Sequence, residues 1–171
     1  VFEKTSAHLD ILSTNSKIAK IVVNGDKWGA MLVEESLGKN FLENKKKKES
    51  LIFKFADERE WLEGWSSDPF WLYRLGDPTL VYDVYNLNKE ICDDKNRRII
   101  SYVIDKMRNY EENLFDNEKL NEALTLSLLW GNLHNLLNNN TSYYFNPYTL
   151  KLEPIVRDQY SIQEIKNLNN L

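Results

Sequence analysis

Two side chains near the C-terminal end of the chain are of the kind that bind a divalent cation. Asn140 and Asp158 stand on either side of a short apolar hairpin whose turn contains Asn146 and Pro147. An amide and a carboxylate both offer hard oxygen ligands, which magnesium prefers, so residues at the two ends of one hairpin can converge on one Mg²⁺ ion. The arrangement predicts a phosphate-binding site in which Asn140 and Asp158 are the metal ligands.

The order of the elements around this pair matches the order of the active-site parts in protein kinases. In kinases, a loop with His, Asp and Asn follows a long helix, and a second Asp follows a short hairpin; the Asn and the second Asp hold the magnesium ions. Here a helix, a loop from His134 to Asn140, a hairpin and Asp158 follow one another in that order. His134 can orient a substrate hydroxyl or simply brace the loop.

A lysine on an N-terminal strand completes this pattern. Lys54 lies in Leu51–Phe55, among apolar neighbours that would bury its stem, and corresponds to the kinase lysine that contacts the nucleotide phosphates. Glu34 or Glu35, at the end of the first hairpin, could be its carboxylate partner. We take Lys54 and Glu35 as the candidate nucleotide-binding residues.

The elements that must position these residues follow from local sequence patterns, and together they predict an α+β fold. Asn24-Gly25 between two apolar β-prone runs predicts a hairpin, in which Gly29 allows a bulge or a close backbone approach. Asp116 is a candidate N-cap. The other predicted elements are a short helix over Glu34–Asn44, a strand over Leu51–Phe55, helices over Asp94–Tyr110 and from Asn117, and a second hairpin formed by Tyr143–Phe145 and Leu150–Ile155.

Length and charge narrow the classes of function. The 171 residues predict one domain, residues 1–171, which we expect to be part of a longer polypeptide. A formal charge of −4 disfavours nucleic acid as a partner, because phosphate backbones call for a basic surface. No apolar run is long enough to predict a membrane span. Cys92 alone makes neither an internal disulfide nor a zinc site.

Several stretches in this order resemble the spore coat protein H (CotH) kinase-like family. They are Ile21–Gly29 with Glu34 and Glu35, then Lys39–Glu43, Ile52–Phe55, His134–Asn140, Tyr143–Pro147 and Leu152–Asp158. The resemblance implies an atypical protein-kinase-like fold, present here in part, that binds ATP with Mg²⁺ and transfers phosphate to the hydroxyls of a protein acceptor. Members are usually longer at both ends.

The sequence departs from a typical kinase at one important position. Asn135 lies five residues before Asn140, where a kinase loop has its catalytic Asp, and an amide cannot accept a proton as a carboxylate does. Asp158 also lacks the usual Gly after it. It can be an ordinary helix N-cap, and Asn140 can be an ordinary loop residue.

Two other functions therefore stay open. One is a catalytically degenerate scaffold of the same fold in a cell-envelope protein, and the compartment itself, cell envelope or secreted, is left open by the sequence. The other is a carbohydrate-binding module that uses the tryptophans of Trp61–Trp71. The run Lys45–Lys48 is expected to be a solvated loop rather than an anion site.

Overall fold

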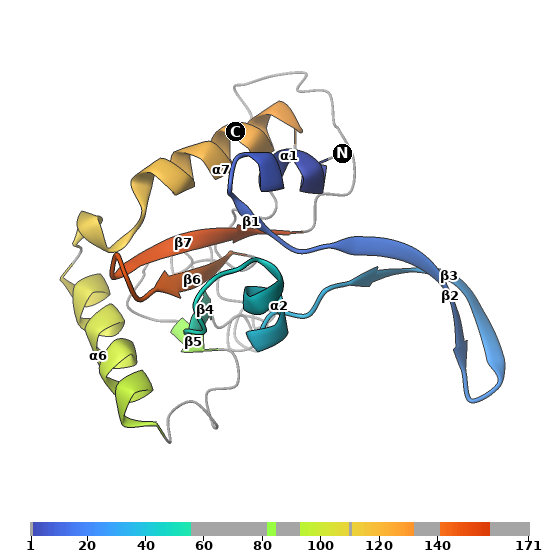
Figure 1. The fold of residues 1–171 in the computed structure, drawn as a ribbon, viewed down its shortest axis with the longest axis horizontal. Helices are drawn as coiled ribbons and strands as arrows, with labels where there is room; N and C mark the ends of the chain where they lie inside the picture. Colours follow the sequence, from blue (N-terminus) through green and yellow to red (C-terminus); the bar gives the residue numbers. More distant parts are fainter. Residues whose placement is uncertain (1, 56–81, 85–92, 110, 132–140, 158–171) are drawn as a thin grey trace, which may run out of the picture.

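The computed structural model describes residues 2–55, 82–84, 93–109, 111–131 and 141–157. These residues form helices and strands, so the predicted α+β class is confirmed (Figure 1). The elements are α1 (Phe2–His8), β1 (Leu12–Ser13), β2 (Ser16–Val23), β3 (Asp26–Glu34), α2 (Lys39–Asn44), β4 (Ile52–Phe55), β5 (Tyr82–Val84), α6 (Asp94–Arg108), η1 (Glu112–Leu114), α7 (Asn117–Leu129), β6 (Ser142–Asn146) and β7 (Lys151–Val156).

A five-stranded sheet is the centre of the molecule. Its strand order is β1-β7-β6-β4-β5, so strands far apart in the sequence lie next to one another. The pairs β7–β6, β6–β4 and β4–β5 are antiparallel, whereas β1 runs parallel to β7. The predicted C-terminal hairpin is confirmed as β6–β7, and the strand predicted over Leu51–Phe55 is confirmed as β4.

Helices cover both faces of this sheet. Because side chains alternate along a strand, Phe53 and Phe145 face α6 and its buried Val103 and Met107, while the neighbouring residues point to the other face. On that other face Ile52, Tyr144 and Ile155 pack against Phe41 and Leu42 of α2. A third cluster joins α1 to α7 through Phe2, Ile11, Ala123, Leu126 and Val156.

Both central helices begin at an N-cap aspartate, and a glycine follows the end of α7. The carboxylate of Asp93 accepts hydrogen bonds from the backbone N–H groups of the first turn of α6. Asp116 does the same for α7 through Lys119 N at 3.2 Å, which confirms the predicted N-cap. Gly131, with φ of 67°, follows the C-cap of α7 and adopts the left-handed conformation that often ends a helix.

The first hairpin, β2–β3, is confirmed but forms a separate two-stranded sheet that projects from the body (Figure 1). Its turn is Asn24-Gly25, where both residues have positive φ. Gly29, with φ of 92°, lies beside the register shift between Ile21 and Val22. Among the described residues, no heavy atom lies within 4 Å of a Cβ placed on Gly29, so its positive φ serves the bulge rather than a close backbone approach.

The predicted helix over Glu34–Asn44 is wrong in its first part. Glu34 is the last residue of β3, where it pairs with Ser16, and Glu35 N donates to Asn15 O at 2.8 Å, so strand pairing continues past the expected helix start. Gly38 then has φ of 152°, a conformation that is not helical. The helix α2 therefore begins only at Lys39.

Candidate functional site

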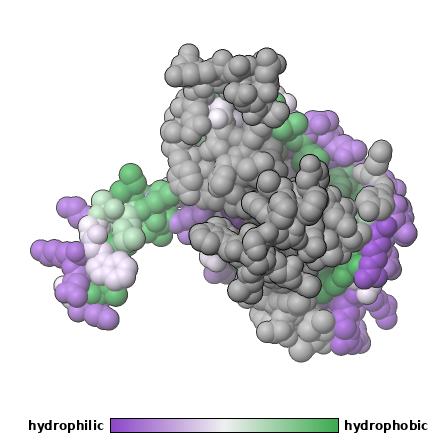
Figure 2. Space-filling model, turned by 180° about the vertical axis from the view of Figure 1, so that it is seen from behind, coloured by the Kyte–Doolittle hydropathy of each residue, from purple (hydrophilic) through white to green (hydrophobic). Residues whose placement is uncertain are grey.

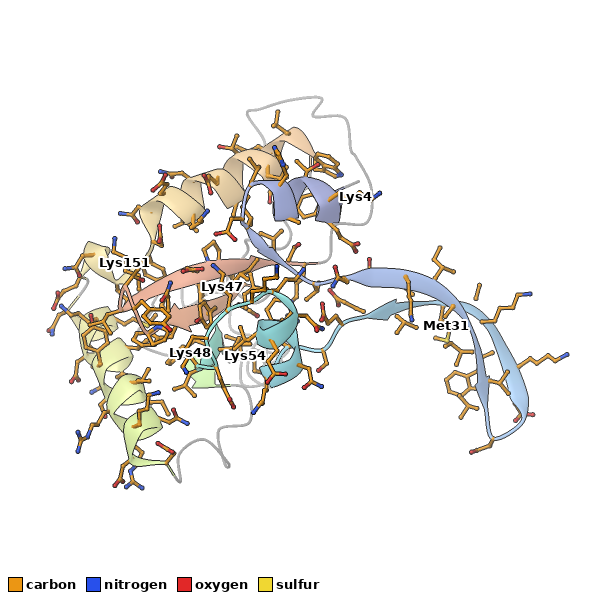
Figure 3. The ribbon with its side chains drawn as sticks, in the orientation of Figure 1. Lys4, Met31, Lys47, Lys48, Lys54 and Lys151 are labelled. Carbon is orange, nitrogen blue, oxygen red and sulfur yellow. The ribbon has the colours of Figure 1, made fainter. Side chains whose placement is uncertain are left out.

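The candidate nucleotide lysine lies in the middle of the sheet. Lys54 is half-buried on β4, and the strand register pairs it with Asp83 of β5 and with Ser142 of β6. Because side chains alternate along β4, Lys54 points to the same face of the sheet as Ile52, which packs against α2; Lys54 is labelled in Figure 3. The lysine thus lies on an inner strand, which fixes its backbone more firmly than an edge strand or a loop would.

Lys54 lies at the open end of the β6–β7 hairpin, opposite its turn. Ser142 is the first residue of β6 and pairs both with Lys54 and with Ile155, the penultimate residue of β7. The chain therefore enters β6 and leaves β7 at the end of the sheet that carries Lys54. Thr141 and Arg157 are the described residues that flank this end.

Ser142, the residue that pairs with Lys54 on the neighbouring strand, is fully buried. The Oγ atom of Ser142 has no hydrogen-bond partner within the part of the chain that the structure describes. A buried hydroxyl without a partner costs free energy, and most buried polar side-chain atoms in native proteins bond to another protein group or to an ordered water molecule.

The two candidate carboxylates at the end of β3 hold the base of the first hairpin. Glu35 accepts hydrogen bonds from Asn15 Nδ2 and from Asn44 Nδ2, both at 2.8 Å, so each of its oxygens has an amide partner. Glu34 accepts a hydrogen bond from Thr14 Oγ1 at 2.5 Å. Glu34 therefore connects the N-terminal segment to β3, and Glu35 connects the same segment to α2. We assign this bracing role to both residues.

A buried ion pair lies farther along the same face of the sheet. Glu153 of β7 is only 5% exposed, and its Oε2 lies 3.1 Å from Lys47 Nζ, as an ion pair without the alignment of a hydrogen bond. Asn146 Nδ2 donates to Oε1 of Glu153 at 2.5 Å. The expectation that all of Lys45–Lys48 is solvated is wrong for Lys47, because Glu153 draws its ammonium onto the sheet.

Asp10 links this pair to α7. Its Oδ2 lies 3.6 Å from Lys47 Nζ and 3.7 Å from Lys119 Nζ. Burial lowers the pKa of Lys119, but a hydrogen bond to Glu122 and the charges of Glu122, Asp10 and Glu153 outweigh it, so the pKa is raised above its usual value. Carboxylates therefore lie beside the ammonium groups of both Lys47 and Lys119.

The tyrosines of β6 are unsuited to act as bases. Burial raises the pKa of Tyr143 to about 12. Burial, followed by the charge of Glu153, also raises the pKa of Tyr144 to about 12, and its hydroxyl donates to Lys48 O at 2.8 Å. Both phenols are therefore neutral near pH 7 and serve packing and loop anchoring.

The remaining predicted site residues lie outside the described residues: His134, Asn135, Asn140 and Asp158, together with the tryptophan segment Trp61–Trp71. In the described ranges, no three His, Cys, Asp or Glu side chains gather as a metal-binding group.

Sequence reasoning missed Glu153 and Lys47. The alternation of Lys151, Glu153 and Ile155 along β7 was a usable signal that Glu153 shares a face with Ile155. Nothing in the sequence distinguishes Lys47 from the lysines beside it.

Comparison with protein-family models gives no match, and comparison with curated proteins gives none either. Among the residues that the structure describes, no helix is long and apolar enough to cross a bilayer.

Proposed function

We propose that this chain is an atypical kinase-like domain that binds ATP with Mg²⁺ and transfers phosphate to the hydroxyls of a protein acceptor. The observation that supports it is the register in which Lys54 pairs with Ser142 and Ser142 pairs with Ile155. One end of the sheet therefore holds the strand lysine, the start of β6 and the end of β7. In the sequence, Asn140 comes two residues before β6 and Asp158 two residues after β7.

Each group has a role that fits its chemistry. The side-chain oxygens of Asn140 and Asp158 would hold Mg²⁺, and the Lys54 ammonium would contact phosphate oxygens. The bound metal would neutralise charge on the phosphates. Phosphoryl transfer proceeds through a loose transition state, so positioning and charge stabilisation do most of the catalytic work.

The absence of a carboxylate at Asn135 affects the acceptor side of the reaction. His134 would orient the attacking hydroxyl, and Asn135 would hydrogen-bond to it without removing its proton. We expect slow transfer for that reason. The Asn135 amide is also the specific observation that favours the second candidate, a nucleotide-binding or inert scaffold in a cell-envelope protein.

The test compares two lysines on the same sheet. Lys54→Met removes the proposed phosphate contact, and Lys151→Met is the matched control, since Lys151 pairs with Asn146 at the opposite end of the β6–β7 hairpin, four residues or about 14 Å away. ATP with Mg²⁺ at 100 times its Kd should stabilise the wild-type chain by about 2.7 kcal/mol, which is roughly 5–11 °C in Tm.

We expect Lys151→Met to keep this stabilisation and Lys54→Met to lose most of it. A folded wild-type chain whose Tm does not change with millimolar ATP and Mg²⁺ would contradict nucleotide binding. Transfer of label from γ-labelled ATP to a generic protein acceptor, lost in Asp158→Ala, would exclude the scaffold. Nucleotide-dependent stabilisation without transfer would favour it.

A further inference from the structure

The tip of the first hairpin combines a reactive sequence with an open position. Asn24-Gly25 is the one Asn-Gly pair in the chain, and both residues are exposed. We call residues Lys17–Val33 the arm; within the described residues its two strands pair only with each other. Figures 1 and 2 show the arm projecting from the body, and Met31 on the arm is labelled in Figure 3. Water therefore reaches the tip.

An asparagine followed by a glycine can lose its side-chain amide without an enzyme, because glycine has no Cβ to hinder the reaction. The Gly25 nitrogen loses its proton to water or hydroxide and attacks Cγ of Asn24. The N–Cγ bond forms, the Cγ–Nδ2 bond breaks, and the amide nitrogen leaves as ammonia after taking up a proton. Water then opens the resulting succinimide ring at either carbonyl carbon. The products are an aspartate and an isoaspartate, whose backbone runs through Cβ and Cγ.

The surroundings of the turn leave this attack unobstructed. A Cβ placed on Gly25 would have no heavy atom of the described residues within 4 Å. The Asn24 side chain has no hydrogen-bond partner among the described residues either. Gly25 also lies outside the ladder, whose last pair before the turn joins Val23 to Asp26. The Asn24 amide is therefore free to move toward the Gly25 nitrogen.

Local opening of the turn controls the rate of this reaction. Asn24 and Gly25 have φ of 51° and 90°, as in a tight hairpin turn, and ring closure needs Asn24 to leave this left-handed conformation. Two ladder pairs lie between the turn and the register shift that follows Ile21, where the bulge interrupts the ladder. An isolated two-stranded ribbon is at best marginally stable in water, so the tip opens more readily than the strands of the central sheet.

The base of the arm contains a comparable pair that the structure protects. Asn15 precedes Ser16, another small residue, and both are exposed. The nitrogen that would attack is held, because Ser16 N donates to Glu3 Oε1 at 2.7 Å. The amide that would be attacked is held as well, because Asn15 Nδ2 donates to Glu35 Oε2 at 2.8 Å. Both hydrogen bonds must break before the ring can close, so we expect Asn15 to react slowly in the folded chain.

We propose that Asn24 is a site of spontaneous deamidation at the tip of the arm, whereas Asn15 at its base is protected by the fold. Either product adds one negative charge next to Asp26. Isoaspartate also lengthens the main chain of a two-residue turn, so the strands cannot keep the register in which Val23 pairs with Asp26. The modification therefore alters the tip of the arm. It does not depend on the proposed nucleotide site.

The test follows both asparagines in one digest of the 171-residue chain. Trypsin releases Ile21–Lys27, in which Asn24 is the one amide side chain, and Thr5–Lys17, in which Asn15 is the one amide side chain. The chain is incubated at mildly alkaline pH, folded in one sample and unfolded in guanidinium chloride in another. Mass spectrometry measures the mass gained when an amide becomes an acid. The unfolded sample gives the rate of each pair without structure, so the folded-to-unfolded ratio isolates the effect of the fold.

We expect this ratio to be at least about tenfold higher for Asn24 than for Asn15. Glu3→Ala removes the acceptor of Ser16 N and should speed the reaction of Asn15 in the folded chain while leaving Asn24 unchanged. Circular dichroism confirms that the variant is folded. A folded wild-type chain whose Asn24 stays intact while the unfolded chain reacts would overturn the proposal. Equal ratios for the two asparagines, or an unchanged Asn15 rate in Glu3→Ala, would contradict protection at the base.

Discussion

The buried ion pair between Lys47 and Glu153 offers a direct test of how the loop after α2 is attached to the sheet. Only 17% of the Lys47 side chain and 6% of the Glu153 side chain are exposed. Lys47→Met keeps the length of the stem but leaves the Glu153 carboxylate buried without its cation. Removing one partner of a buried pair typically costs about 3–5 kcal/mol.

We expect the lower end of this range, about 3 kcal/mol, because Asn146 still donates to Glu153 and Lys47 is not fully buried. For a chain of this size the loss corresponds to a Tm lower by roughly 6–12 °C. Urea denaturation followed by circular dichroism measures the free energy of unfolding. Lys39→Met is the control, since Lys39 pairs with Glu49 on the surface and its loss should hardly change stability.

A double variant separates the charge from the shape. Glu153→Gln keeps the side-chain size and removes the charge, so Lys47→Met with Glu153→Gln should be more stable than Lys47→Met alone. If Lys47→Met unfolds at the same urea concentration as Lys39→Met, or if Glu153→Gln restores nothing, the unpaired carboxylate is not the cause of the loss and the reasoning is refuted.

Two further predictions concern the helices and tyrosines. Asp116→Ala removes the N-cap of α7 and should cost about 1 kcal/mol in urea denaturation, whereas an unchanged midpoint would show that the cap contributes nothing. Burial raises the pKa of Tyr143 and of Tyr144 from 10.0 to about 12, so the folded state holds their protons more tightly. The stabilisation of the folded state by these protonated phenols is complete below pH 10 and should be lost between pH 10 and 12. The loss should be smaller in Tyr144→Phe than in the wild type. Equal losses in the two proteins would contradict the raised pKa of Tyr144.

Elements with local signals could be predicted from the sequence. Asn24-Gly25 specified its turn because both residues accept positive φ, and the apolar spacing of Ile99, Val103 and Met107 specified α6. The start of α2 at Lys39 was missed because it depends on β3 continuing to pair with β2 as far as Glu34. The β1 strand was missed because its two residues are set by pairing with β7.

The surroundings of the candidate site could be predicted only in part for the same reason. Lys54 was correctly placed on a strand because apolar neighbours mark that strand, but its pairing with Ser142 joins residues 88 positions apart and has no local signal. Glu35 was expected beside a lysine, yet its carboxylate accepts hydrogen bonds from Asn15 and Asn44. The burial of Lys47 likewise depends on a carboxylate more than 100 positions away.

Titration calorimetry of ATP binding, with and without Mg²⁺, tests the central claim most directly. The proposed site predicts binding by the wild type that requires Mg²⁺ and that weakens at least tenfold in Lys54→Met and in Asp158→Ala, while Lys151→Met binds as the wild type does. Binding that is equal in all four proteins, or a folded wild-type chain that gives no heat of binding at millimolar ATP, would contradict a nucleotide site at this end of the sheet.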